Sequence, residues 1–279
     1  MSQPGSGQLA ANNGPLMSAP PDIDKPPQDL PPANPIRALR KSFQAVAKAT
    51  RRGGNLMAAR LPAPVRAALA GPVAYADMLL VDHGVFRLAY LNRHALTPRA
   101  WRSAQPAPHD IAWFARRGVR SVLNLRGYRD CGAYRLEQKA CRANGIEMID
   151  FALFSRGAPA KETIRDAALL LNRIAYPMLM HCKSGADRAG LMAVLYMHLK
   201  EGAPMREAVK QLSWRFGHFR DGATGVLDAF FDEYLAFDAR TPTPFLQWVD
   251  QHYDPEALKR SFRPTGLGSL LVDRILRRE

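Results

Sequence analysis

Cysteine is scarce in this sequence, with three residues among 279. An odd and sparse set of this kind argues against the disulfide framework of a small secreted fold. No two cysteines have the CxxC spacing, and no cluster of His and Cys has metal-ligand spacing, so we expect no metal and no other cofactor. We interpret Cys131 and Cys141 as structural residues.

Long hydrophobic runs are also lacking. No uninterrupted apolar stretch reaches the roughly 18–20 residues that a membrane span requires. The longest candidate, residues 67–81, contains Pro72 and Asp77. Residues 1–35 have neither the charged start nor the apolar core of a secretory signal, so export is not expected. These absences favour a globular protein of the cytoplasm.

Aromatic residues are missing from residues 1–35, which hold 9 of the 22 prolines. Such a segment buries too little apolar surface to offset its ordering entropy, and we predict a disordered tail. A proline-rich ligand for another domain is the alternative interpretation.

Acidic residues are absent from residues 36–76. We interpret residues 36–77 as a basic arm. Leu39, Phe43 and Val46 recur at roughly helical spacing and predict a short basic amphipathic helix. The arm suits an anionic lipid surface at the inner face of the membrane, or it is a solvated segment. Nucleic acid is not an expected partner, because aromatic residues do not alternate with the basic ones. The net charge of the chain is +14. The basic residues of the arm are Arg37, Arg40, Lys41, Lys48, Arg51, Arg52, Arg60 and Arg66.

Residues 78–253 alternate between strand and helix patterns and predict one α/β domain, with a parallel or mixed sheet flanked by helices. Residues 254–279 are predicted to form a basic C-terminal extension. The predicted strands are 118–125, 146–151 and 177–181. The predicted helices are 108–117, 133–144, 161–176, 187–200, 205–215, 224–237 and 244–252.

One segment carries the chemistry, and it runs from His181 to Gly190, HCKSGADRAG. It lies where an apolar strand ends and a helix begins, a junction whose backbone amides bind phosphate. Gly185 allows the chain to turn tightly around an oxyanion. The positive field there favours the thiolate of Cys182, and Arg188 can hold two phosphate oxygens with its planar guanidinium. The predicted phosphate-binding residues are Lys183, Ser184, Gly185, Ala186, Asp187 and Arg188.

The segment resembles the signature of the cysteine-dependent protein tyrosine phosphatase superfamily, His-Cys, five residues and Arg. Residues 101–106, WRSAQP, and 122–127, VLNLRG, are similar to the opening of bacterial members of the dual-specificity branch. The resemblance covers roughly residues 85–240. It implies the fold of a dual-specificity phosphatase and hydrolysis through a phosphocysteine on Cys182, with Arg188 binding the phosphate oxygens and no metal required. It also implies that His181 supports the loop by a hydrogen bond.

Two carboxylates can supply the proton that the leaving group needs. Asp150 ends the second predicted strand, near the position where dual-specificity relatives keep their aspartate, and its alternative role is structural. Asp187 lies inside the loop, where some bacterial relatives with a Gly-x-Asp-Arg pattern have their acid, and its alternative role is to cap the helix. Residues 151–159 contain no acid, which favours Asp187 slightly.

Four other residues are candidate supporting groups. Gln211 and His218 follow the loop helix and can position water or line the pocket, while Arg126 and Lys183 add positive charge at the carboxyl edge of the sheet. This charge favours a phospholipid or glycolipid phosphate as substrate, the alternative being a phosphoprotein in the cytosol. Ala189 stands where the family usually has Ser or Thr to assist the departing thiolate. The third hypothesis is therefore a phospho-ligand binder with little turnover.

Overall fold

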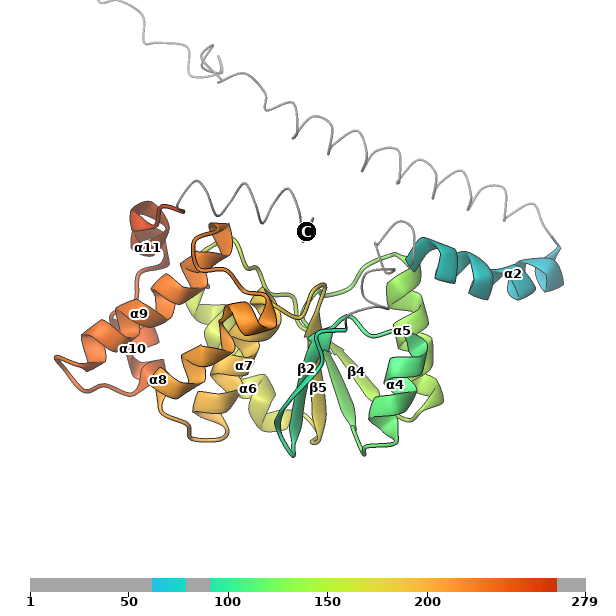
Figure 1. Cartoon of the computed structure of the whole chain (residues 1–279), viewed down its shortest axis with the longest axis horizontal. Helices are drawn as coiled ribbons and strands as arrows, with labels where there is room; N and C mark the ends of the chain where they lie inside the picture. The colour runs from blue at the N-terminus through green and yellow to red at the C-terminus, as the bar shows by residue number, and fades with distance from the viewer. Residues whose placement is uncertain (1–61, 79–90, 265–279) are drawn as a thin grey trace, which may run out of the picture. The chain divides into compact units, whose positions relative to one another are not determined.

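The sheet has five strands in the order β1-β2-β5-β3-β4, with β1 antiparallel to β2 and the other neighbours parallel (Figure 1). The computed structural model describes residues 62–78 and 91–264. The predicted α/β fold with a mixed sheet is confirmed. The strands are β1 His94–Thr97, β2 Ala100–Ala104, β3 Ser121–Asn124, β4 Glu147–Asp150 and β5 Met178–Cys182.

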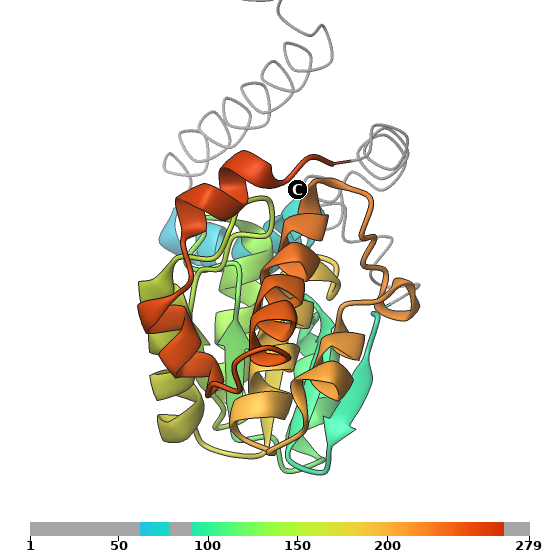
Figure 2. The same ribbon diagram turned by 90° about the vertical axis from the view of Figure 1, so that its left-hand side faces the viewer.

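Helices cover both faces of the sheet (Figures 1 and 2). One face packs on α4 and α5, through a core that includes Ile111, Phe114 and Cys141. The other face packs on α6 and α7, with the C-terminal helices outside them. The bounds are α4 Pro108–Ala115, α5 Gly132–Ala143, α6 Lys161–Arg173, α7 Asp187–Leu199, α8 Met205–Ala208, α9 Val226–Asp238, α10 Phe245–Gln251 and α11 Pro255–Ser261.

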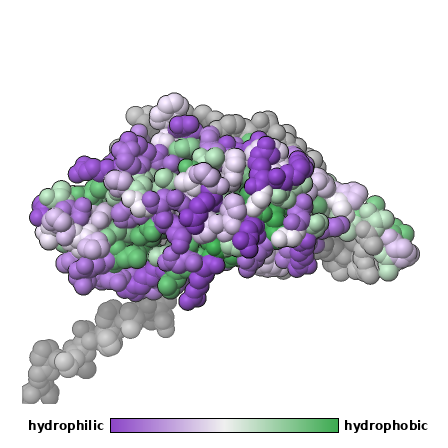
Figure 3. Space-filling view, turned by 90° about the horizontal axis from the view of Figure 1, so that it is seen from below, coloured by the Kyte–Doolittle hydropathy of each residue, from purple (hydrophilic) through white to green (hydrophobic). Residues whose placement is uncertain are grey.

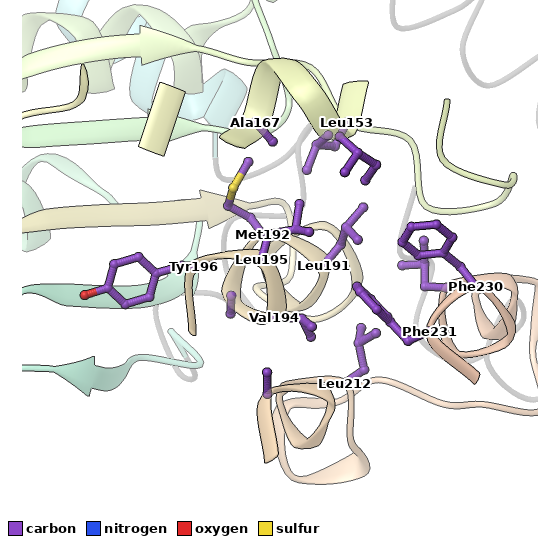
Figure 4. Close-up of a cluster of buried hydrophobic side chains, with 14 of the residues drawn as sticks. Leu153, Ala167, Leu191, Met192, Val194, Leu195, Tyr196, Leu212, Phe230 and Phe231 are labelled. Atoms are coloured by element: carbon purple, nitrogen blue, oxygen red, sulfur yellow. The ribbon is translucent and has the colours of Figure 1, made fainter. Parts of the chain in front are cut away.

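β5 and α7 form the centre of the domain because both are apolar nearly all round. All five residues of β5 are buried, as expected for a strand between two parallel neighbours. Helix α7 is buried from Asp187 to Tyr196, and its Leu191 points into the larger core toward Phe230 and Phe231 of α9 (Figure 4). The connection between β5 and α7 is therefore held on both sides by packed elements.

The predicted helix over residues 205–215 is confirmed only at its start. Helix α8 ends at Ala208, and short 3-10 turns follow at Val209–Gln211 and Trp214–Phe216. The carbonyl oxygens of Gln211 and Phe216 accept hydrogen bonds from distant side chains instead of from the next helical turn. Sequence patterning shows no such tertiary partner, and strands β1 and β2 were likewise not among the predicted elements.

Two helices lie in segments that were expected to extend from the domain. Helix α2, Ala63–Ala76, falls in the basic arm, whose predicted helix around residues 39–47 is outside the described residues. Helix α11 is capped by Asp254, whose carboxylate accepts hydrogen bonds from two backbone amides, and its Leu258 is buried in the larger core. Within residues 62–78 and 91–264, no helix is long and apolar enough to cross a membrane.

Candidate active site

The candidate site lies at the carboxyl end of the central strand β5. Cys182 ends this strand with 1% of its surface exposed, a loop follows, and Asp187 begins α7. The neighbouring strands β2 and β3 run parallel to β5, so their carboxyl ends lie at the same edge. Ligands of open α/β sheets bind at this edge.

Gly185 sets the shape of the loop. Its φ is +74°, and a Cβ at this position would lie 2.6 Å from the backbone of Ser103 and Ala104. Its amide nitrogen donates a hydrogen bond to Cys182 Sγ at 3.2 Å. Only glycine combines this conformation with so close an approach, and the turn brings an amide donor onto the sulfur.

The carbonyl groups of the loop are held on its outer side. Asn92 Nδ2 donates to Ser184 O at 3.0 Å, and Arg102 Nη2 donates to Gly185 O at 2.8 Å and to Ala186 O at 3.0 Å. The C=O and N–H groups of a trans peptide point in opposite directions. Holding the carbonyls outside therefore turns the amides that follow them inward, where they can bind the oxygens of a phosphate.

Arg102 is the main support of this loop, and it is completely buried. Its second terminal nitrogen donates to both the backbone oxygen and the side-chain oxygen of Gln211, and its guanidinium carbon lies 4.2 Å from the centre of the Phe216 ring. Burial lowers the pKa of Arg102 to about 10, although the nearby Cys182 and Asp187 favour its charged form. Arg102 is thus still a cation at neutral pH. The sequence motif that contains Arg102 predicted no role for it, and Gln211 was expected to position water or line the pocket.

A second buried network lies under Cys182. His181 Nε2 is 2.6 Å from Glu137 Oε1, and both side chains are fully buried. Glu137 Oε2 accepts from Gln105 Nε2 at 2.8 Å, and Gln105 Oε1 accepts from Arg126. His181 Nδ1 also lies 3.4 Å from the Cys182 carbonyl oxygen, and its support of the loop stays a prediction. Arg126 lies at the predicted edge but is 7% exposed and bonded to Gln105, while Glu137 on α5 gave no signal in the sequence.

Asp187 and His218 belong to a buried triad. His218 Nδ1 lies 2.7 Å from Asp187 Oδ1, and His218 Nε2 lies 2.6 Å from Asp228 Oδ2. Burial alone lowers the pKa of His218, but the hydrogen bonds with the two carboxylates outweigh it and raise this pKa to about 9. At neutral pH the ring therefore holds a proton between two carboxylates. Asp228 also lines a pocket of about 480 Å³, together with residues 209–213 and Phe231.

Asp150, the other candidate acid, has different surroundings. It is exposed, and its carboxylate accepts hydrogen bonds from Asn124 Nδ2 and from the Tyr134 hydroxyl, both at 2.7 Å. Asn124 is in register with Asp150 on one side and with His181 on the other. Two strand spacings of ~4.8 Å therefore separate Asp150 from β5.

The remaining predicted residues also lie at this junction. Arg188 is the second residue of α7 and is 8% exposed, and Ala189 beside it is fully buried. Lys183 and Ser184 in the loop are half-buried.

The three cysteines are buried and unbridged, and burial, with a smaller contribution from Glu137, raises the pKa of Cys141 to about 12. Among the residues that the structure describes, no three His, Cys, Asp or Glu side chains group as a metal site.

Comparison with known proteins identifies the family. A family model described as "DSP-PTPase phosphatase fused to NAD+ Kinase" matches residues 90–221. The dual specificity protein phosphatase TpbA of Pseudomonas aeruginosa (strain UCBPP-PA14) is 26% identical over 184 residues, which cover 64% of this chain and 73% of TpbA. Residues 90–221 are therefore a dual-specificity-like phosphatase region of the cysteine-dependent protein tyrosine phosphatase superfamily.

Solved structures are similar to parts of this phosphatase at low identity. The crystal structure of P. aeruginosa TpbA is 18% identical, covers 62% of this chain and 91% of its own, and gives a TM-score of 0.43. A putative phosphatase from Shewanella putrefaciens CN-32 is 16% identical, covers 55% of this chain and 95% of its own, and gives a TM-score of 0.42. The phosphatase is a phosphoric monoester hydrolase, and its substrate is a phosphorylated molecule. The family match includes Arg102, the loop and His218 but ends before Asp228.

Proposed function

We propose that Cys182 is the nucleophile of this phosphatase and that its substrate is a phospholipid or glycolipid phosphate at the cytoplasmic face of a membrane. The observation that supports the catalytic part best is the loop around Cys182. Its carbonyls are bonded on the outside by Asn92 and Arg102, and the Gly185 amide donates to the sulfur. Hydrogen bonds of this kind stabilise a thiolate, and a row of inward amides stabilises the charge that develops on phosphate oxygens.

In the first step, Cys182 Sγ attacks phosphorus, an S–P bond forms and the P–O bond to the leaving group breaks. Arg188 and the loop amides hold the three equatorial oxygens during this displacement. The leaving oxygen carries away the electron pair of the broken bond and needs a proton. No metal takes part in this scheme.

Asp187 is our candidate for the group that delivers this proton, with His218 and Asp228 behind it. The His218 Nδ1 proton moves to the Asp187 carboxylate across the 2.7 Å hydrogen bond, and Asp187 passes it to the leaving oxygen. His218 then keeps one proton on Nε2, bonded to Asp228. The transfer leaves one proton fewer in the triad and a neutral leaving group.

In the second step, a water attacks phosphorus, the S–P bond breaks and the thiolate departs. The water's proton goes back to Asp187 and on to His218, which restores the triad. Ala189 has no hydroxyl to assist the thiolate, but the Gly185 amide lies 3.2 Å from Sγ and can do so. This amide is the reason to prefer an enzyme that turns over to a ligand-binding protein.

Asp150 remains the alternative acid, and the two carboxylates can be separated by experiment. Tyr134 and Asn124 both donate to the Asp150 carboxylate, whereas Asp187 contacts a protonated histidine that can supply a proton. For the true acid, replacement by Asn should reduce turnover of an alkyl phosphate ~10²–10⁴-fold and barely change that of an aryl phosphate with a good leaving group. We expect this pattern for Asp187→Asn and not for Asp150→Asn. The reverse pattern would transfer the role to Asp150.

The proposed substrate rests on charge. The chain carries a net charge of +14, and its residues 36–76 hold eight basic residues and no acidic one. Lys183 adds a further cation to the loop itself. An anionic membrane surface attracts such a segment with ~1 kcal/mol per basic residue. We therefore propose that the basic arm, between the tail of residues 1–35 and the domain that begins at residue 78, brings the phosphatase to lipids. A cytosolic dual-specificity protein phosphatase is the second candidate, and the relative TpbA is named a dual specificity protein phosphatase.

The deciding experiment compares phosphate release from a phosphotyrosine peptide, from phospholipid phosphates and from glycolipid phosphates. Wild type is measured beside Cys182→Ser, which keeps the loop but lacks the thiolate. Lipid-preferring release that Cys182→Ser abolishes would support both parts of the proposal. Release from the peptide alone would support the cytosolic alternative. Binding without release by wild type would favour the ligand-binding protein and make Ala189 the first position to change.

A further inference from the structure

Helix α2 presents an apolar stripe to solvent. Val65, Leu69 and Val73 are spaced by four residues and so lie on one side of the helix, with 42%, 44% and 62% of their surfaces exposed. Arg66 is the only charged residue between Ala63 and Ala76. Hydrophobic residues lie at the surface at the right-hand end of Figure 3, where Figure 1 places α2. A helix this apolar is normally covered by another surface.

The C-terminal end of α2 is fixed to the phosphatase domain. Asp77 Oδ2 accepts a hydrogen bond from the Gly132 amide at 2.5 Å, and Gly132 packs so closely on Ala74 that a Cβ there would lie 2.4 Å from Ala74 O. Met78 is buried against Cys131 and Tyr134 of the same region. The exposed stripe is therefore carried by a helix with a defined attachment.

This attachment lies at the edge of the sheet that holds the candidate active site. Gly132 starts α5, the helix that follows the carboxyl end of β3, and β3 is parallel to β5. Two large aromatic side chains are exposed in loops at this edge, Tyr128 after β3 (71%) and Phe154 after β4 (83%). A surface that binds α2 would thus meet the domain beside the edge where Cys182 lies.

The charge of the neighbouring sequence indicates which surface this is. The eight basic residues between positions 36 and 76 have no acidic neighbour in that stretch, and all but Arg66 precede α2. An apolar stripe next to a basic segment matches the two layers of an anionic bilayer surface, headgroups outside and acyl chains beneath. Fourteen residues of helix span roughly 21 Å, which is less than the hydrocarbon core. The helix can lie along such a surface but not cross it.

We propose that α2 is an interfacial membrane helix whose Val65, Leu69 and Val73 insert into the headgroup boundary of an anionic bilayer and present the carboxyl edge of the sheet to that bilayer. The part about presentation rests on the proposed lipid-phosphatase function. The binding itself does not depend on it.

The test is co-sedimentation of the full chain with vesicles of phosphatidylcholine containing 30% phosphatidylglycerol, compared with phosphatidylcholine alone. The triple variant Val65→Gln, Leu69→Gln, Val73→Gln removes the stripe without adding charge. We expect its partition into the anionic vesicles to fall at least tenfold, while its hydrolysis of a soluble aryl phosphate stays at the wild-type rate. Leu169→Gln is the matched control, because Leu169 is 54% exposed on α6, and it should bind like wild type.

Equal partition of wild type and the triple variant would overturn the proposal. A second result would also overturn the proposal. If light scattering shows that wild type self-associates and the triple variant does not, while both bind vesicles equally, then a second copy of the chain covers the stripe. Failure of the lipid-phosphatase function has a different signature, namely vesicle binding that depends on the stripe together with no phosphate release from lipids.

Discussion

The pH dependence of stability tests the buried triad most directly. The pKa of His218 is about 9 in the folded protein, against an ordinary value of 6.5. Between these two values the folded chain keeps a proton that the unfolded chain has lost. The stabilisation is therefore complete below pH 6.5, declines as the pH rises, and is lost above about pH 9. A pKa raised this far corresponds to roughly 3 kcal/mol.

The change to make is His218→Gln in a Cys182→Ser background, which removes the reactive thiol from both proteins being compared. Glutamine can donate to one of Asp187 and Asp228 but not to both, and it carries no charge. At pH 6 we expect the variant to be less stable by roughly 3 kcal/mol, and at pH 9.5 the difference should largely disappear. With an m-value of ~2 kcal/mol/M, the urea midpoints should differ by ~1.5 M at the lower pH.

The assay is urea unfolding at half-unit steps from pH 6 to pH 9.5, followed by tryptophan fluorescence. Taking the difference between the two proteins cancels the titration of groups that they share. His198→Gln is the control, because its ring bonds to the Ala203 carbonyl oxygen instead of to a carboxylate. If the difference in unfolding free energy between His218→Gln and its parent is as large at pH 9.5 as at pH 6, the imidazolium between two carboxylates is not what stabilises this region.

Two further predictions concern the support of the loop. Arg102→Lys replaces a planar guanidinium, which bonds the Gly185, Ala186 and Gln211 oxygens, by a single ammonium. We expect the free energy of unfolding in urea to fall by ~2 kcal/mol and kcat/KM on an aryl phosphate to fall at least tenfold. Wild-type kinetics would refute this role. Gly185→Ala should raise the KM for the same substrate at least tenfold, because the added Cβ meets backbone at 2.6 Å. Gly157→Ala, where nothing lies within 4 Å of the added Cβ, should behave as wild type, and equal KM values for the two variants would contradict the loop geometry.

The chemistry-bearing segment could be predicted from the sequence because its signals are local. An apolar strand, a cysteine, a loop glycine, an arginine and a helix follow one another within about twenty residues, and each has a conformational or chemical meaning by itself. The strands at 121–124, 147–150 and 178–182 were predictable for the same reason, since short apolar runs alternate there with helical spacing.

The groups that support the loop became visible only in the tertiary structure. Asn92 and Arg102 reach carbonyls more than eighty residues away, and the pattern around them gives no sign of these bonds. The same holds for Glu137, which lies on a helix face and meets His181 only because α5 packs on the sheet. A buried polar side chain is recognised by its partners, and these come from distant parts of the chain.

The sequence by itself determined the family, the fold class and the candidate nucleophile, because these depend on residues close together in the chain. It left Asp150 and Asp187 nearly equal as acids, and it gave His218 no definite role. The tertiary structure gave the two carboxylates different neighbours, a protonated His218 for Asp187 and two hydrogen-bond donors for Asp150, and the choice between them as acids stays a prediction. Proton affinity is set by burial and by neighbouring charges in space, and only the folded chain brings these together.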